Sequence, residues 1–384
     1  MRRTPKENIN QSFINLIRKA HGLIENSDIE KHRHSQDQMG ALFGNSREVA
    51  VTETTVGSMY AEWIRVDRPH SGKKIILYCH GGGYSTGSPL YARTLTTKLA
   101  SQLSMDVFCF DYRLAPEHPY PAAVDDAQTA WDFLMLQGYG AKDIFVAGDS
   151  AGGNLALALG LRLKKQKRML PAGFVLMSPW TDLTVSGKTH VTKADVDPVL
   201  NQNYLNEMIE NYVPQAKKVQ MEAVKPLQEA GTLQEGNILQ AADTLREANA
   251  LQEGNIIRAA GTLQERNTLQ TANTLQTAGT EKQKPGDKSA NKVFEEIFDT
   301  EYLRNPEISP LFGDFTGFPP TYIQVGDLEV LMSDSTMLQK KMSGEGVAVS
   351  LDTYKNMWHV FQMGPFKTAV EAIHKCGEFI YSVQ

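Results

Sequence analysis

Short, continuously apolar runs alternate with amphipathic stretches along most of this chain of 384 residues. Such runs, bounded by turn residues, predict strands that are buried on both faces of a sheet, with helices between them. The expected strands are Lys74–Cys79, Asp106–Tyr112, Asp143–Ala147, Gly173–Met177, Thr321–Val325 and Val347–Tyr354, and two of the expected helices are Ala122–Leu136 and Asn154–Lys164. The pattern predicts an α/β fold with a mostly parallel central sheet and helices on both faces, in which an active site lies at the carboxyl ends of the strands.

Two other patterns precede these strands. Apolar residues at helical spacing between Ile9 and Ile24 predict an amphipathic helix that packs on the rest of the protein. The alternation in Val49–Thr52 and Met59–Ile64, on either side of Gly57, predicts an antiparallel pair of strands.

A six-residue unit, LQEAGT in its first copy, occurs nine times with variations between Leu227 and Thr280. No aromatic residue occurs between Tyr212 and Phe294, and this low hydrophobicity favours a disordered tract. A period of six aligns the leucines on one face of an extended chain, so a small β-solenoid is one alternative. A fraying helix is the other, although the same period spreads the leucines around a helix. The expected division is cap helices in 1–45, the α/β domain in 46–215 and 292–384, and the inserted repeats in 216–291.

Composition and charge indicate which partners to expect. Hydrophobic residues make up 41% of the chain and the net charge is −5, values that indicate neither a nucleic-acid nor a membrane partner. No apolar run approaches the ~18 residues that cross a bilayer. Because no apolar segment follows Met1-Arg2-Arg3, we expect no export signal and a cytoplasmic protein. The oligomeric state is left open, with a homodimer as one option.

The three cysteines, Cys79, Cys109 and Cys376, are expected to be reduced and packed in the core, since their number is odd and no CxxC occurs. His32 and His34 are expected at the surface rather than on a metal. We therefore predict no metal site, and no organic cofactor is required.

The candidate chemistry begins with the motif Gly148-Asp149-Ser150-Ala151-Gly152, which is a GxSxG sequence between an expected strand and an expected helix. Small residues around Ser150 suit the strained strand-to-helix turn that exposes a nucleophilic serine. The helix N-terminus also stabilises negative charge that develops there.

A second motif, His80-Gly81-Gly82-Gly83, follows the strand that ends at Cys79. Consecutive glycines let backbone N–H groups approach an oxyanion, and no GK[ST] sequence follows that would indicate a phosphate loop. Together the two motifs predict a nucleophile and an oxyanion hole.

With the stretch Asp111 to Asp126, which contains DYRLAPEHPYPAA, these motifs resemble the hormone-sensitive-lipase family of α/β-hydrolase esterases. Within that family the likeness is greatest to bacterial carboxylesterases described as monoterpene ε-lactone hydrolases. It covers residues 45–212 and 294–383. The resemblance implies a helical cap and a serine nucleophile at Ser150. We expect the Asp111–Asp126 stretch to be structural, with Arg113 in a buried ion pair.

The resemblance also implies the remaining site residues. It makes the backbone N–H groups of Gly82, Gly83 and Ala151 the oxyanion hole, while His80 fixes the loop through hydrogen bonds. It makes His359, in Asn356-Met357-Trp358-His359, the general base.

The acid of such a triad should follow the strand Thr321–Val325, where Asp327, Glu329 and Asp334 all occur. Many family members carry their acid two residues before a leucine, which here selects Glu329, two before Leu331, with Asp327 as the alternative. Asp334 is expected at a helix start.

Apolar residues beside these loops, Tyr84, Trp180, Met357, Trp358 and Met363, are candidates for the substrate pocket or equally for the core. No charged residue suggests itself as an anchor, so the expected substrate is a neutral short- to medium-chain ester or a lactone. Arylacylamidase or formamidase activity on the same triad, a non-catalytic receptor of this fold, and an interaction protein that uses the repeats are the rival functions.

Overall fold

The computed structural model describes residues 14–15, 17–19, 28–44, 46, 48–66, 68, 73–218 and 294–383. By its contacts the chain divides into two units, Met1–Ala216 with Asp299–Gln384, and Lys217–Phe298. The hexapeptide repeats and most of the expected helix between Ile9 and Ile24 lie outside the described residues. In the second unit, the N–H of Lys218 donates to the carbonyl oxygen of Ile297 at 2.8 Å.

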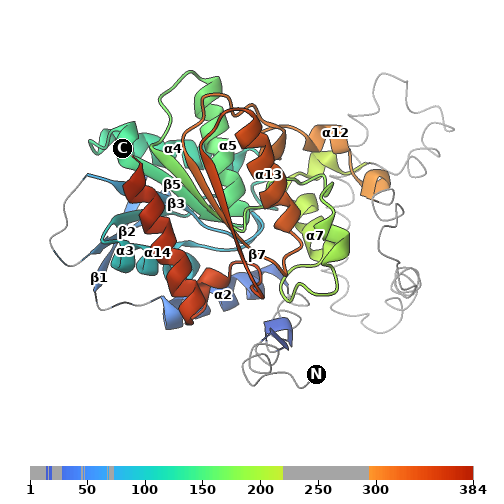
Figure 1. Ribbon diagram of the computed structural model, residues 1–384, viewed down its shortest axis with the longest axis horizontal. Coiled ribbons are helices and arrows are strands. Elements are labelled where there is room, and N and C mark those ends of the chain that lie inside the picture. The colour runs from blue at the N-terminus through green and yellow to red at the C-terminus, as the bar shows by residue number, and fades with distance from the viewer. Residues whose placement is uncertain are drawn as a thin grey trace, which may run out of the picture. The chain divides into compact units, whose positions relative to one another are not determined.

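An eight-stranded sheet forms the centre of the first unit (Figure 1). Its strands are β1 (Val49–Val56), β2 (Met59–Val66), β3 (Ile75–Cys79), β4 (Asp106–Phe110), β5 (Ile144–Asp149), β6 (Gly173–Met177), β7 (Thr321–Gly326) and β8 (Val349–Tyr354). They follow the order β1-β2-β4-β3-β5-β6-β7-β8. The pairings β1–β2 and β2–β4 are antiparallel, and all pairings from β4 to β8 are parallel. The expected mostly parallel sheet and its antiparallel pair are confirmed.

The order of the strands positions the site. β3 has β4 on one side and β5 on the other, so the chain reverses its direction of travel across the sheet at β3. Such a switch point opens a crevice at the carboxyl ends of the strands. β3, β5, β6 and β7 are buried at every position, as continuously apolar strands between two helix layers must be.

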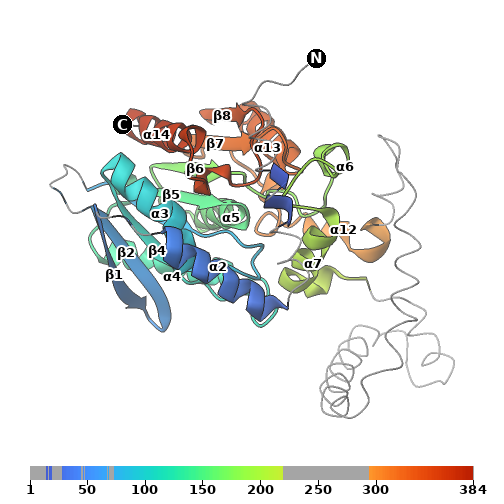
Figure 2. The same ribbon diagram turned by 90° about the horizontal axis from the view of Figure 1, so that it is seen from below.

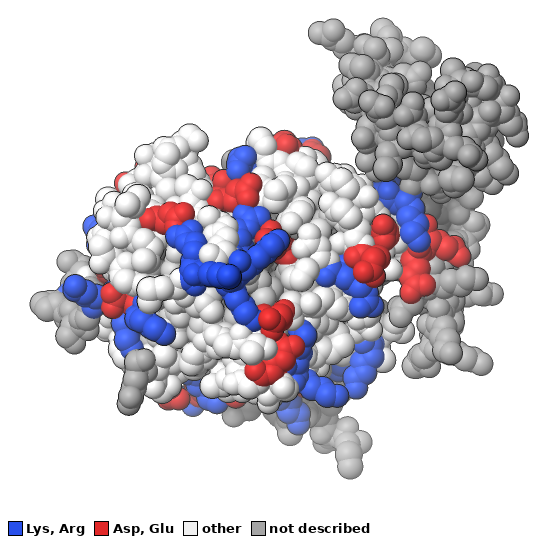
Figure 3. Space-filling view, turned by 90° about the horizontal axis from the view of Figure 1, so that it is seen from above, with Lys and Arg blue, Asp and Glu red and all other residues white. Residues whose placement is uncertain are grey.

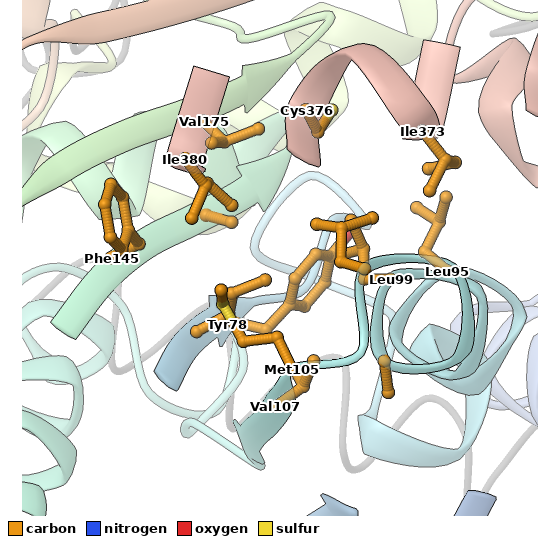
Figure 4. Packing of buried hydrophobic residues seen from close by; sticks show 14 of the residues in the cluster. Tyr78, Leu95, Leu99, Met105, Val107, Phe145, Val175, Ile373, Cys376 and Ile380 are labelled. Carbon is orange, nitrogen blue, oxygen red and sulfur yellow. The ribbon is translucent and has the colours of Figure 1, made fainter. Parts of the chain in front are cut away.

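Helices cover both faces of the sheet (Figures 1 and 2). α3 (Pro89–Leu103) and α14 (Lys367–Ser382) lie on one face, and α4 (Ala122–Leu136), α5 (Ala151–Lys165) and α13 (Met332–Gly344) lie on the other. In Figure 4, Leu95 and Leu99 of α3 and Ile373 and Cys376 of α14 lie close together in the buried cluster, with Val175 of β6 nearby. All three cysteines are buried free thiols, as expected from their apolar surroundings.

The remaining helices add a layer over this core. α2 (Ile29–Phe43) packs along α3, where Gly40 lies so close to the backbone of Leu90 that a Cβ would meet its carbonyl oxygen at 2.0 Å. α6 (Thr189–Thr192), α7 (Gln202–Tyr212) and α12 (Thr300–Leu303) lie between β6 and β7 in the chain. The surface position expected for His32 is wrong: its ring is buried and close to that of Tyr204, because α2 turns this face inward.

Charged side chains are largely paired where the fold brings elements together. Arg162 of α5 binds Asp125 at 2.5 Å and Glu307 at 2.6 Å. Arg113 binds Asp126 at 2.8 Å but is 49% exposed, so the expected ion pair forms at the surface and not in the interior. On the face in Figure 3, basic and acidic side chains lie next to one another. Within the described part of the chain, no helix combines the length and hydropathy needed to cross a membrane.

Candidate active site

Ser150 occupies the turn between β5 and α5, at the carboxyl end of the strand. Its φ of 53° lies in a region that non-glycine residues rarely adopt. The tight turn requires small neighbours, because a Cβ on Gly152 would come within 2.0 Å of the carbonyl oxygen of Cys79, and one on Gly148 within 2.3 Å of the carbonyl oxygen of Gly152. This strain presents the Ser150 side chain at the end of the sheet.

Hydrogen bonds connect Ser150 to His359 and His359 to Glu329. Ser150 Oγ lies 2.9 Å from His359 Nε2, and His359 Nδ1 lies 3.0 Å from Glu329 Oε2. Both the imidazole and the carboxylate are buried. An imidazole that donates its Nδ1–H to a carboxylate keeps a lone pair on Nε2, and this lone pair can accept the proton of Ser150. The arrangement can thus convert a serine hydroxyl into a nucleophile.

Of the three carboxylates after β7, Glu329 is the one that faces His359. Its other oxygen, Oε1, accepts the N–H of Gly326 at 2.5 Å. Asp327 instead accepts the N–H of Asn356 at 2.6 Å. Asp334 lies in the first turn of α13, as expected, where it binds the N–H groups of Thr181 and Asp182.

The charges around His359 favour its protonated form. Burial by itself lowers the pKa of His359, but the hydrogen bond to Glu329 and the negative charges of Glu329, Asp197 and Asp149 outweigh burial and raise the pKa. Burial raises the pKa of Asp149 and of Asp197 to about 6. The result is an imidazole of increased basicity in contact with a serine hydroxyl.

The loop after β3 lies beside the start of α5, since the Cα of Gly152 packs on the backbone of Cys79 and His80. Gly82 and Gly83 have φ values of 113° and 62°, which side chains rarely permit. Among the residues that the structure describes, no acceptor binds the N–H groups of Gly82, Gly83 and Ala151. Three unengaged N–H groups of this kind can bind an oxyanion.

Buried polar groups hold this loop. The N–H of Gly81 donates to Asp149 Oδ1 at 3.1 Å, and Tyr78 donates its hydroxyl to the same oxygen at 2.6 Å. His80 Nδ1 lies 2.9 Å from the carbonyl oxygen of Gly81, and its ring stacks on Tyr112 at 4.1 Å. Burial lowers the pKa of His80 to about 4, so its ring is neutral and its contacts are those of a loop anchor.

The apolar pocket candidates are packed side chains. Tyr84 stacks on Tyr212 of α7 with ring centroids 3.7 Å apart. Trp180 is buried, and Met357 and Trp358 belong to a cluster with Ile14 and Phe361. Their contribution to a substrate pocket stays a prediction. Among the described residues, no group of three or more His, Cys, Asp or Glu side chains is arranged to hold a metal ion.

Three supporting residues were not identified from the sequence. Ser178 donates its hydroxyl to Glu329 Oε1 at 2.7 Å. Asp197 accepts the N–H of Val330, next to Glu329, at 2.8 Å. Lys98 donates to three carbonyl oxygens, those of residues 362–364, just after His359. The only sequence signal is for Ser178, a small polar residue directly after a buried strand.

Comparisons with known proteins identify the family of the chain. The family model described as alpha/beta hydrolase fold matches residues 76–250 and 236–363. An esterase of Acinetobacter venetianus is 30% identical over 349 residues, covering 90% of this chain and 87% of that protein. An acetyl-hydrolase of Streptomyces hygroscopicus is 29% identical over 336 residues, covering 88% and 83%. The crystal structure of a hormone-sensitive lipase from a metagenome library is 30% identical and covers 97% of both chains, with a TM-score of 0.69.

The chain has relatives along nearly its whole length that are esterases. It also has the sheet order, the serine at a strand-to-helix turn and the glycine loop described above. The family model spans more than half of the sequence. The chain belongs to the α/β-hydrolase fold family, within its hormone-sensitive-lipase group of esterases, and is a hydrolase of the carboxylesterase type.

Proposed function

We propose that the protein hydrolyses neutral carboxylic esters of short to medium acyl length, or lactones, with Ser150 as nucleophile, His359 as general base and Glu329 as the acid that orients the imidazole. The observation that carries this proposal is the continuous hydrogen-bonded path from Ser150 Oγ through the imidazole to the buried Glu329 carboxylate.

In the first half of the reaction, Ser150 Oγ attacks the ester carbonyl carbon and its proton passes to His359 Nε2. The oxyanion that forms accepts hydrogen bonds from the N–H groups of Gly82, Gly83 and Ala151. When the intermediate collapses, the bond to the alcohol oxygen breaks and His359 returns the proton to the leaving alkoxide. The products of this half are the alcohol and an acyl-enzyme on Ser150.

In the second half, His359 takes a proton from water as the water oxygen attacks the acyl carbon. Collapse of the second intermediate breaks the bond to Ser150 Oγ, which recovers its proton from His359. The carboxylic acid leaves. No metal or organic cofactor takes part in these steps, and the expected partner is a small-molecule ester.

The preference for modest acyl chains follows from the bulky candidates around the site. If Trp180, Met357 and Trp358 line it, they leave room for an acyl group of about C4 to C8. A series of p-nitrophenyl esters from C2 to C12 tests this, and faster turnover of the C12 ester than of the C4 ester would contradict it. A lactone and an anilide in the same series separate the lactonase and amidase alternatives.

Substitution of the nucleophile tests the mechanism. Ser150→Ala should lower kcat for p-nitrophenyl butyrate by about 10⁴-fold or more, as removal of a triad nucleophile does. Circular dichroism and the Tm of the variant should match the wild type, since the hydroxyl contributes chemistry and little packing. More than about one per cent of the wild-type kcat in folded Ser150→Ala would refute the proposed nucleophile.

A further inference from the structure

Ser178 lies directly after β6, and its buried hydroxyl contacts two of the loops that form the site. It donates to Glu329 Oε1 at 2.7 Å. Ser178 Oγ also accepts the N–H of Val360, the residue that follows His359, at 3.2 Å. One hydroxyl group thus connects the loop of the carboxylate to the loop of the imidazole.

The turn that contains Ser178 also contacts a third loop of the site, the one that holds Ser150. The N–H of Ser150 donates to the carbonyl oxygen of Met177 at 3.0 Å, and the N–H of Trp180 donates to the carbonyl oxygen of Ser150 at 3.0 Å. The N–H of Ser178 itself donates to the carbonyl oxygen of Gln324 in β7 at 2.7 Å. The turn from Met177 to Trp180 is therefore bonded to all three loops and to the neighbouring strand.

We infer that Ser178 is a positioning residue whose hydroxyl fixes the Glu329 carboxylate and the His359 loop relative to each other. The inference rests on the proposed function, in which Glu329 orients His359. Ser178 is not itself a second nucleophile, because its hydroxyl proton is engaged by the carboxylate and no imidazole nitrogen accepts it among the described residues.

The Ser178 hydroxyl restrains the residues at both ends of the contact. Glu329 Oε1 accepts hydrogen bonds from Ser178 and from the N–H of Gly326, which leaves Oε2 directed at His359 Nδ1. Hydrogen bonds to an ionised carboxylate are the strong ones, so loss of one of two anchors frees the carboxylate to rotate. Val360 has a φ of 50°, a conformation that a valine adopts only under constraint, and the bond from its N–H to Ser178 supplies part of that constraint.

Two substitutions remove the hydroxyl in different ways. Ser178→Ala keeps Cβ, while Ser178→Gly suits the φ of 48° at this position and protects the fold if the alanine variant is insoluble. The matched control is Ser335→Ala, because Ser335 is equally buried and its hydroxyl has no hydrogen-bond partner in the described part of the chain. The measurements are kcat and KM for p-nitrophenyl butyrate, and the far-downfield proton resonance of His359 Nδ1–H.

Both Ser178 variants should lower kcat by about 10- to 100-fold, the value of one hydrogen bond to a charged group, with KM within about threefold of the wild type. Their downfield resonance should move or disappear. Ser335→Ala should keep the wild-type kcat and resonance.

A kcat within about threefold of the wild type in the Ser178 variants, or a lowered kcat with an unchanged resonance, would overturn the inference. Failure of the inference and failure of the proposed function give different results. If wild-type protein hydrolyses no ester, the proposed function fails, whereas the resonance of His359 in the Ser178 variants still decides whether Ser178 positions the pair.

Discussion

His359 Nδ1 lies 3.0 Å from Oε2 of Glu329, whereas Asp327, only two residues earlier, binds the backbone of Asn356. Glu329→Gln should therefore lower kcat by about 10³- to 10⁴-fold, because an amide no longer fixes the imidazole tautomer or stabilises the imidazolium. Asp327→Asn is the matched control and should cost less than about tenfold. The measurement is steady-state hydrolysis of p-nitrophenyl butyrate, and the reverse ranking of the two variants would make Asp327 the acid.

The pH dependence of activity should reflect the surroundings of His359. The raised pKa of His359 means that the base becomes neutral, and hence active, only at a higher pH than an ordinary histidine. The acid limb of kcat/KM should then have its midpoint above 6.5, the ordinary value, and activity should rise with pH through it. A midpoint below 6.5 would contradict the proposed role of the surrounding carboxylates.

Stability should change in the opposite direction over the same range. A group whose pKa is higher in the folded than in the unfolded state contributes stability below its unfolded pKa, and this contribution is lost as pH rises through the folded pKa. The contribution of His359 is therefore complete below about 6.5 and falls as the enzyme becomes active. The free energy of unfolding of wild type minus that of His359→Gln, measured against pH, gives this contribution. The difference should fall as pH rises, and a difference that grows with pH would contradict the prediction.

Lys98 should stabilise the His359 loop. Its Nζ donates to the carbonyl oxygens of Gln362, Met363 and Gly364 at 3.0, 2.7 and 2.9 Å. Lys98→Met leaves these carbonyls without their donor, which should cost about 1–3 kcal/mol of stability and also lower kcat, since the loop follows His359 directly.

Lys74 offers a matched control for that variant, because its Nζ donates to the carbonyl oxygens of Ile380 and Val383 at the end of α14. Lys74→Met should lower the Tm but leave kcat unchanged. Urea unfolding and p-nitrophenyl butyrate kinetics on both variants make the comparison, and an equal loss of kcat in the two would indicate a general effect of destabilisation.

The elements of the sheet could be predicted from the sequence because they depend on local pattern. Gly173–Met177 and Ala122–Leu136 match β6 and α4 at both ends, and the Ser150 turn follows from the small residues it requires. A short, continuously apolar run between two amphipathic helices suits few structures other than a buried strand. Such features are encoded within a few neighbouring residues.

The supporting contacts depend on tertiary structure and leave no such pattern. Lys98 and Gln362 are 264 residues apart, and Ser178 and Glu329 are 151 residues apart. Even the choice between Asp327 and Glu329 depends on a side-chain direction after β7 that residue spacing alone does not determine. The burial of an ion pair also depends on tertiary structure. The identity of Arg113 predicts that it has a partner but not that the pair lies at the surface.

Residues 222–288, which include the hexapeptide repeats, should be replaceable by a short Gly-Ser linker without loss of ester hydrolysis. Ala216 and Asp299 are joined at the point where the first unit is interrupted, with the N–H of Asp299 donating to the carbonyl oxygen of Ala216 at 2.6 Å. The N–H of Lys218 donates to the carbonyl oxygen of Ile297 at 2.8 Å, so a linker has only a short distance to span.

Shortening a connection from about 80 to about 10 residues removes three doublings of loop length, a gain of about 2 kcal/mol in closure entropy if the tract packs on nothing. The deletion variant should therefore be at least as stable as the wild type, with an unchanged kcat for p-nitrophenyl butyrate. Insoluble protein, or a Tm lower by more than about 8 °C, would show instead that the repeats form a packed module such as a β-solenoid.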